Sequence, residues 1–311
     1  MKKILTIILF IIAMQEVRAQ QDILLSQYMF NPLLLNPAYA GSKDYMMATL
    51  LYRKQWVSFK GAPETEVATL HGPWGLKSLG WGVTVSNDHI GVTNRTSAYF
   101  SLAYHLKLNN SLKLGMGINA GGDFYSYNNG DLKFWDTEDP DFAGNKSGFQ
   151  PNIGAGLYLY NNDKFYIGLS VPTIISYSPT ENLSASTITS GDLVPHQVRH
   201  YYATAGVVIP FSDDVIMKPS VLVKYVANTP VETDFNLNFL FANLIWVGGS
   251  YRTGDSFVAL LEIQLSKQWR LGYSYDFTTT DVKNYSSGSH EIMLGYDFGY
   301  DIMKMKTPRY F

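Results

Sequence analysis

The stretch AYFSLAYHLKL, residues 98–108, alternates two kinds of side chain. One set is apolar or aromatic and consists of Ala98, Phe100, Leu102, Tyr104, Leu106 and Leu108. The other set is mostly polar and consists of Tyr99, Ser101, Ala103, His105 and Lys107. Successive side chains on a β-strand point to opposite faces of the sheet. The stretch therefore predicts a strand with one apolar face and one mostly polar face.

The same alternation recurs along the chain and is clearest near its end. Residues 257–265 and 269–277 place apolar side chains on one face and charged or small side chains on the other. A dry protein core would not accept such charges without partners. We therefore expect the second faces to line the interior of a barrel, with mixed charges and no ring of a single sign. The expected inward side chains are His105, Lys113, Lys224, Glu262, Gln264, Arg270, Asp276, Glu291 and Asp297.

Fourteen segments fit this strand pattern, and many are long enough to cross a bilayer as tilted strands. They are residues 44–57, 64–72, 78–88, 94–108, 111–122, 150–160, 164–172, 197–211, 215–226, 231–241, 244–252, 255–266, 268–279 and 289–298. An even number of antiparallel strands is typical of single-chain bacterial outer-membrane barrels. The predicted fold is therefore all-β: a transmembrane antiparallel β-barrel of the outer-membrane type.

The lengths of the connections test this prediction independently of hydropathy. The expected long connections are residues 123–149, 173–196 and 280–288, and all of them follow odd-numbered strands. The connections after even-numbered strands are short, as at 109–110 and 242–243. Outer-membrane barrels sort their loops in this way, with short turns in the periplasm and longer loops outside.

The two ends of the chain extend beyond the predicted barrel of residues 44–298. Residues 1–19 combine a basic start, an apolar run and a small-residue cleavage site, as in a secretory signal peptide. Residues 20–43 are expected to form a periplasmic plug or docking segment, and residues 299–311 a periplasmic tail. The chain contains no cysteine, so we expect no disulfides and no thiolate chemistry.

Signals for catalysis or cofactors are weak. The six histidines form no metal-binding or catalytic motif, and Asp88-His89 is more simply a solvated turn than the acid–base pair of a hydrolase. An acidic stretch at 136–141 could bind Ca²⁺, although it lacks EF-hand spacing and is more typical of a solvated loop. Its carboxylates are Asp136, Glu138, Asp139 and Asp141. We therefore expect no enzyme and no cofactor, and the mild net charge of −2 argues against nucleic acid.

The stretch QDILLSQYMFNPLLLNPAYAGS, residues 21–42, resembles the amino-terminal signature of the PorP/SprF family of outer-membrane proteins. GSHEIMLGYDF at 288–298 and TPRYF at 307–311 are similar to the last strand and carboxy terminus of that family. The resemblance implies a non-enzymatic outer-membrane barrel of the type IX secretion system of Bacteroidetes. The sorting of the loop lengths predicts that both termini are periplasmic. The resemblance also implies a role in secretion or surface anchoring of cargo, including gliding-motility adhesins.

The implied partners are periplasmic ring components and lipoproteins of the machinery, or the carboxy-terminal domain of a secreted cargo, besides outer-membrane lipid. Candidate contact residues lie in the amino-terminal segment and in one outer loop, where exposed aromatics often anchor partners. They are Ser26, Gln27, Tyr28, Phe30, Asn31, Pro32, Asn36, Pro37, Tyr39, Gly41, Phe134, Trp135 and Phe142. The amino-terminal segment could instead only seal the barrel. A transport barrel for a small apolar solute is the alternative function.

Overall fold

The computed structural model describes residues 25–128, 145–161, 164–177, 190–191 and 196–299. The expected signal peptide, the acidic stretch at 136–141 and most of the expected carboxy-terminal tail lie outside these residues. Within the described chain, no helix has the length and apolar character required to cross a membrane.

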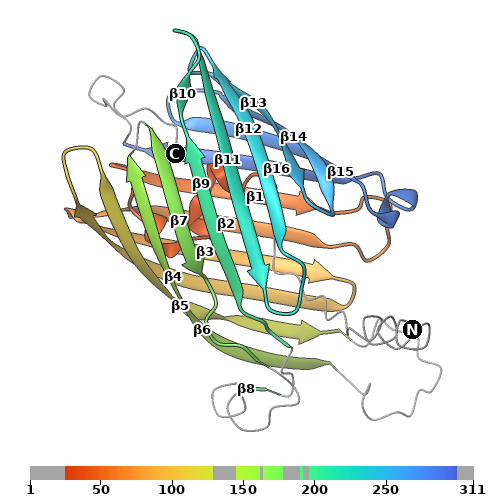
Figure 1. Cartoon of the computed structure of the whole chain (residues 1–311). Helices are drawn as coiled ribbons and strands as arrows, with labels where there is room; N and C mark the ends of the chain where they lie inside the picture. Colours follow the sequence, from red (N-terminus) through yellow and green to blue (C-terminus); the bar gives the residue numbers. More distant parts are fainter. Residues whose placement is uncertain (1–24, 129–144, 162–163, 178–189, 192–195, 300–311) are drawn as a thin grey trace, which may run out of the picture.

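Sixteen strands and four short 3₁₀ helices make up the described structure (Figure 1). The strands are β1 (Met46–Lys54), β2 (Glu64–Trp74), β3 (Leu76–Ile90), β4 (Thr93–Lys107), β5 (Lys113–Tyr127), β6 (Lys146–Asn161), β7 (Phe165–Val171), β8 (Ser190–Gly191), β9 (His200–Val207), β10 (Ile209–Pro210), β11 (Val215–Val226), β12 (Glu232–Phe241), β13 (Ile245–Arg252), β14 (Ser256–Gln264), β15 (Trp269–Thr278) and β16 (Ser289–Phe298). The 3₁₀ helices are η1 (Tyr28–Phe30), η2 (Pro32–Leu34), η3 (Pro37–Tyr39) and η6 (Asp281–Asn284).

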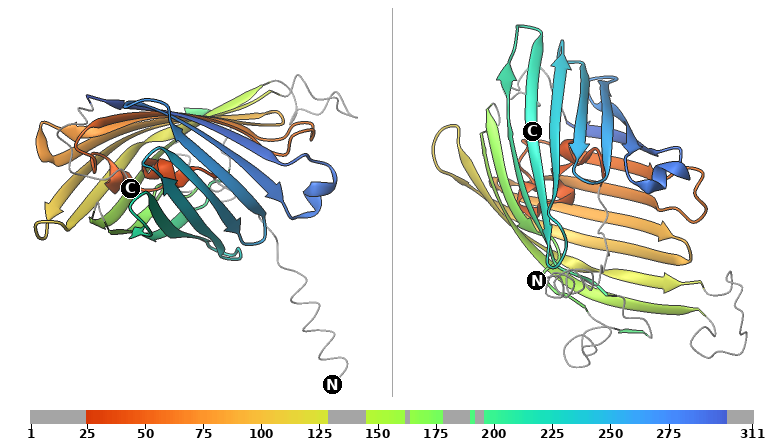
Figure 2. Two further views of the ribbon diagram at one scale, coloured as in Figure 1. Left: turned by 90° about the horizontal axis from the view of Figure 1, so that it is seen from above. Right: turned by 45° about the vertical axis from the view of Figure 1, so that its right-hand side comes forward.

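The strands close into one antiparallel barrel (Figure 2). β16 pairs with β1, and Phe298 lies opposite Met46. β9 pairs with β11 on the other side of the ring, so every crossing strand has two neighbours. β10 continues β9 after the single residue Val208, and the two-residue β8 pairs only with β6. Fourteen strands therefore cross the barrel, which confirms the predicted fold class.

Several strand limits differ from the expected ones. β1 ends at Lys54 and not at residue 57. β3, β5 and β6 are longer than expected, because their hydrogen-bonded ladders continue through polar residues. Asp88 and His89 consequently lie within β3 and not in a loop, and the chain turns at Gly91, whose φ is +61°. The connection expected at 123–149 is shortened at both ends, since β5 extends to Tyr127 and β6 begins at Lys146.

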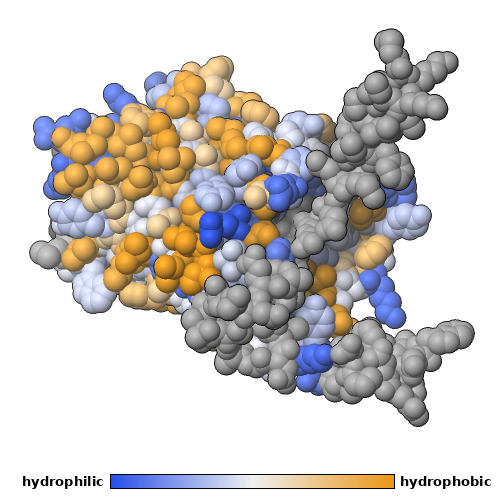
Figure 3. Space-filling model, turned by 60° about the horizontal axis from the view of Figure 1, so that its bottom comes forward, coloured by the Kyte–Doolittle hydropathy of each residue, from blue (hydrophilic) through white to orange (hydrophobic). Residues whose placement is uncertain are grey.

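The two faces of the barrel wall follow the predicted alternation. On β4, Phe100, Leu102 and Tyr104 are exposed, whereas Ser101 and His105 are buried inside the barrel. The same division holds on β14, β15 and β16, where the outward side chains are mainly apolar. Figure 3 shows hydrophobic side chains gathered over the barrel wall. This apolar band is what a lipid-facing surface requires.

The interior holds the amino-terminal residues 25–42, which we call the lumen segment (Figure 2). Pro32 and Pro37 each occupy the first position of a 3₁₀ helix, where a missing N–H costs nothing. The Asn36 side chain caps η3 by accepting a hydrogen bond from the Ala38 N–H. The two Asn-Pro steps therefore divide the segment into three single turns, η1 to η3, which fold it compactly within the lumen.

Glycines on the inner wall allow the lumen segment to approach β5 and β6 closely. A Cβ atom on Gly117 would lie 2.3 Å from the Ala38 nitrogen, and one on Gly156 would lie 2.1 Å from Asn36 Oδ1. On the outside of the same strands the wall carries a groove of about 1070 Å³. The groove is bordered by exposed apolar residues that include Leu102, Met116, Leu157, Leu169, Tyr201 and Tyr225.

Gly117→Ala is expected to lower the free energy of unfolding by about 1–3 kcal/mol, because the added methyl group forces the Ala38 backbone away from the wall. The measurement is a urea titration of the purified barrel in detergent. Gly249→Ala is the matched control, since its Cβ meets only the Val258 carbonyl oxygen, at 3.3 Å. Equal stability of the two variants would contradict the proposed close fit at Gly117.

Candidate functional site

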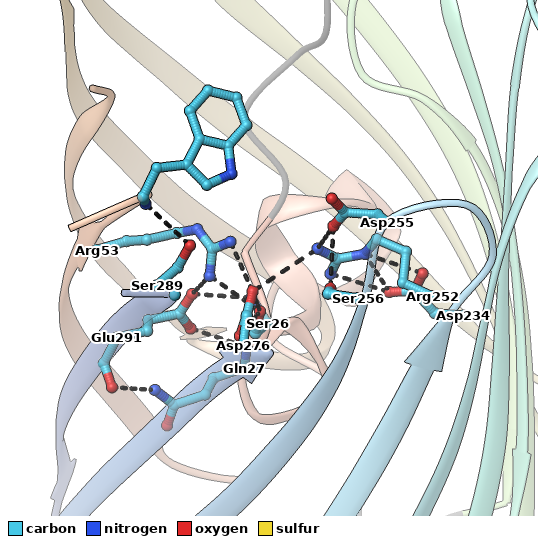
Figure 4. Close-up of polar contacts among 12 residues, drawn as sticks. Ser26, Gln27, Arg53, Asp234, Arg252, Asp255, Ser256, Asp276, Ser289 and Glu291 are labelled. Atoms are coloured by element: carbon cyan, nitrogen blue, oxygen red, sulfur yellow. Dashed lines mark hydrogen bonds and ion pairs between the residues drawn. The ribbon is translucent and has the colours of Figure 1, made fainter. Parts of the chain in front are cut away.

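A buried group of charges holds the start of the lumen segment (Figure 4). Arg53 of β1 forms ion pairs with Asp276 of β15 and Glu291 of β16, at 2.7 and 3.2 Å. The backbone N–H groups of Ser26 and Gln27 each donate a 2.8 Å hydrogen bond to the Glu291 carboxylate. The Ser26 hydroxyl donates to Asp276 and accepts from Arg53. Three strands and the lumen segment therefore meet in one hydrogen-bonded group.

A second arginine extends this charge cluster along the wall. Arg252 of β13 pairs with Asp234 of β12 at 3.1 Å and with Asp255 at 3.3 Å. It also lies 4.0 Å from Asp276, so this carboxylate faces both arginines (Figure 4). Buried ion pairs of this kind are strongly destabilising to break, because the remaining partner stays desolvated and unpaired.

The middle of the lumen segment bonds to strands on opposite sides of the barrel. Asn31 donates to the Thr69 hydroxyl of β2 at 2.9 Å. The Tyr28 hydroxyl accepts from Asn236 of β12 at 2.7 Å. The Asn36 side chain donates to the Leu157 carbonyl of β6 at 2.9 Å. These bonds satisfy polar groups that face the interior of the wall and hold the segment across the lumen.

The last turn of the lumen segment packs against aromatic and histidine side chains. The Tyr39 ring makes edge contacts with His71 and Tyr158, at centroid distances of 5.3 and 5.5 Å. His105 Nε2 lies 2.8 Å from the Ala40 carbonyl oxygen. His105, expected to face an aqueous lumen, is thus buried against the segment.

The lumen segment runs along the barrel from one end to the other. Ser26 contacts Arg53, which lies next to the last residue of β1. Gly41 donates to His71, which is paired with Met47, the second residue of β1. The end near Arg53 carries the connections 55–63 and 279–288, and we call it the long-loop end. The end near Met47 carries the turns 108–112 and 242–244, and we call it the short-turn end.

A second polar group lies on the wall of β4 and β5. The buried Asp123 carboxylate accepts hydrogen bonds from Arg95, Ser97, Tyr99 and Gln197. Beside it, a cavity of about 100 Å³ separates the leucines of the lumen segment from the hydroxyl-bearing wall. Pockets for small ligands are usually about 300–1,000 Å³, so this cavity is small beside them.

The candidate contact residues of the amino-terminal segment lie together inside the barrel. Phe30 and Pro32 are partly buried, and the other eight are buried. The buried ones are Ser26, Gln27, Tyr28, Asn31, Asn36, Pro37, Tyr39 and Gly41. Phe134, Trp135, Phe142 and the acidic stretch at 136–141 lie outside the described residues. Among the residues that the structure describes, no cluster of three or more side chains could hold a metal ion.

Arg53, the cation that holds Ser26, was not among the expected inward side chains. The signal for it is the alternation in β1, where Met47, Thr49, Leu51 and Arg53 share the buried face. Asp276 and Glu291 were expected to point inward, and they do. The interior, expected to carry mixed charges, is salt-bridged in this part of the barrel, and the lumen segment adds hydrogen bonds to the ion-paired residues.

The fold and the filled lumen define the class of protein: a closed membrane β-barrel of fourteen strands that carries its own internal segment. A family model described as "Type IX secretion system membrane protein PorP/SprF" matches residues 17–296. The chain therefore belongs to the PorP/SprF family, which is a family of secretion membrane proteins and not of enzymes. Among curated proteins, a search found no match.

Solved structures with a similar fold are outer-membrane barrels of low sequence identity. CymD, a monoaromatic hydrocarbon channel, is 13% identical over 89% of this chain and 94% of its own, with a TM-score of 0.53. The Ralstonia pickettii toluene transporter TbuX is 10% identical over 85% and 92%, with a TM-score of 0.49. A Pseudomonas aeruginosa FadL homologue is 13% identical over 85% and 93%, with a TM-score of 0.44. These likenesses concern the fold alone.

Proposed function

We propose that the protein is a non-conducting outer-membrane anchor of the type IX secretion system, which holds a secreted cargo or a component of the machinery. The observation that carries this proposal is the filled lumen. Residues 25–42 are held there by hydrogen bonds to the buried ion-paired residues of the wall, by other side-chain hydrogen bonds and by aromatic packing. A barrel closed in this way works through its loops and outer surface and not through a central passage.

Transport of a small apolar solute is the alternative function, and the interior argues against it. The cavity left beside the lumen segment is about 100 Å³, whereas pockets for small ligands are usually about 300–1,000 Å³. On the side of the barrel wall it is lined by hydroxyl groups and by the Arg95 guanidinium, which do not suit an apolar solute. Passage would require the lumen segment to leave its buried contacts.

The long-loop end is the best-supported contact surface for a partner. Phe59, Val231 and Tyr285 are exposed there, on three different connections of the described chain. Exposed aromatics are the side chains that most often anchor protein partners. The loop residues Phe134, Trp135 and Phe142 are proposed to act at the same end, because they also follow an odd-numbered strand. The candidates in the lumen segment could act only after leaving the barrel.

Deleting the gene is expected to remove particular secreted proteins from the cell surface, as measured by surface proteomics. The double substitution Phe59→Ser and Tyr285→Ser is expected to weaken recovery of the same partner about tenfold in affinity purification, because it removes two anchors. Phe211→Ser is the matched control, since Phe211 and Tyr285 are both 72% exposed but lie at opposite ends of the barrel. An unchanged surface proteome, together with reduced solute uptake, would refute the anchor and favour the transporter.

A further inference from the structure

The two ends of the described chain leave the barrel on opposite sides. Phe298 ends β16 opposite Met46, at the short-turn end. Leu25 begins the lumen segment near Leu51, Val67 and Met293, and the adjacent Ser26 bonds to Arg53 at the long-loop end. The lumen segment thus runs along the inside of the barrel and does not only cover its mouth.

The order of contacts along the lumen segment establishes its direction. Ser26 lies at the level of Arg53, Asn31 at the level of Thr69, and Gly41 at the level of His71. Arg53 pairs with Thr65, so these contacts follow β2 progressively from the long-loop end to the short-turn end. The chain then turns at Gly41, whose φ is +70°, and returns through the wall as β1.

Little room remains in the lumen beside the described segment. Gly41 and Gly80 approach so closely that a Cβ on Gly41 would lie 2.3 Å from the Gly80 Cα. A cavity beside the leucines has a volume of about 100 Å³. The buried Arg53 cluster closes the wall on the side of β1, β15 and β16. The described chain therefore begins, at Leu25, toward the long-loop end of the barrel.

We propose that the amino terminus of the mature protein emerges at the long-loop end and is displayed on the cell surface, while the chain beyond Phe298 emerges on the periplasmic side. This assignment uses the rule that short turns of bacterial barrels face the periplasm. In this arrangement, the outer membrane lies between the residues near the amino terminus and the periplasmic machinery. A partner that binds them is therefore an extracellular protein, such as a secreted one, and not a periplasmic component.

Single cysteines test the proposal, because the natural chain has none. Gln21→Cys reports on the chain before Leu25, Tyr285→Cys on the long-loop end and Asn110→Cys on the short-turn end. Each full-length variant is treated on intact cells with a membrane-impermeant maleimide, and again after permeabilisation. Retention of a heat-sensitive mobility on gels serves as the check that each barrel is folded.

The expected result is that Gln21→Cys is labelled on intact cells as completely as Tyr285→Cys, whereas Asn110→Cys is labelled only after permeabilisation. Labelling of Gln21→Cys only together with Asn110→Cys would overturn the proposal, and would place the amino terminus in the periplasm. The outcome does not depend on cargo binding, so it separates this proposal from the proposed function.

Discussion

Replacing Arg53 by methionine is expected to lower the free energy of unfolding by about 3–5 kcal/mol. The side chain is buried and pairs with both Asp276 and Glu291, so its loss leaves two carboxylates desolvated without a cation between them. The Ser26 hydroxyl also loses the hydrogen bond that the Arg53 guanidinium donates to it. Urea titration of the folded barrel in detergent, followed by tryptophan fluorescence, measures the change.

Lys54→Met is the matched control for this experiment. Lys54 is the next residue in β1 and also forms an ion pair, with Glu64 at 2.6 Å, but the two side chains are 44% and 40% exposed. Exposed pairs contribute about 0–1 kcal/mol, so this variant should remain close to the natural protein. Adding Asp276→Asn and Glu291→Gln to Arg53→Met should recover part of the stability, because the buried negative charges are then gone. Equal losses for the Arg53 and Lys54 variants would contradict the importance of the buried cluster.

Replacing residues 26–41 by a glycine–serine linker of the same length is expected to turn a silent barrel into a conducting one. The linker keeps the chain continuous into β1 but lacks the leucine, tyrosine and asparagine side chains that fill the lumen. A flexible linker also gains nothing from being held in one conformation, so it leaves the interior open part of the time. Single-channel recording in planar bilayers should then show current steps.

The natural protein is the control for the linker experiment, and it should show no steps under the same conditions. A folded Lys54→Met barrel should also show no current steps, because Lys54 forms an exposed ion pair with Glu64 and the substitution leaves the lumen segment unchanged. A linker variant that is folded but as silent as the natural protein would show that the wall closes the passage without the segment. That result would contradict the proposal that the lumen segment is what prevents conduction through the barrel.

The barrel was predictable from sequence because its wall separates two very different environments. Lipid outside and polar groups inside impose the alternation seen in residues 98–108, and the same faces appear in the structure. The limits of β3, β5 and β6 were less predictable. Polar residues occupy both faces of the β3–β4 ladder near its end, at Asp88, His89 and Asn94. The alternation of apolar and polar side chains therefore ends before the backbone hydrogen bonds between the strands do.

The lumen segment was only partly predictable. Its position before the first strand predicted a plug or docking segment, and the structure places Tyr28 and Tyr39 inside the barrel. The direction of the segment and its partners could not be read from the sequence. Ser26 and Glu291 are separated by 265 positions, and a backbone N–H carries no sequence signal for the carboxylate that binds it. Such contacts depend on how the whole ring closes.

The position of Ser26 bears on how the barrel is assembled. The pairing of β1 with β16 joins the first and last strands, so it is the contact with the greatest separation along the chain and is expected to form late. Ser26 bonds to Arg53 on one side of this junction and to Glu291 on the other. A barrel that closes with its amino-terminal residues outside would bury three charged groups without these bonds. The last step of folding is therefore more favourable when the lumen segment already occupies the interior, which couples ring closure to correct threading of the chain.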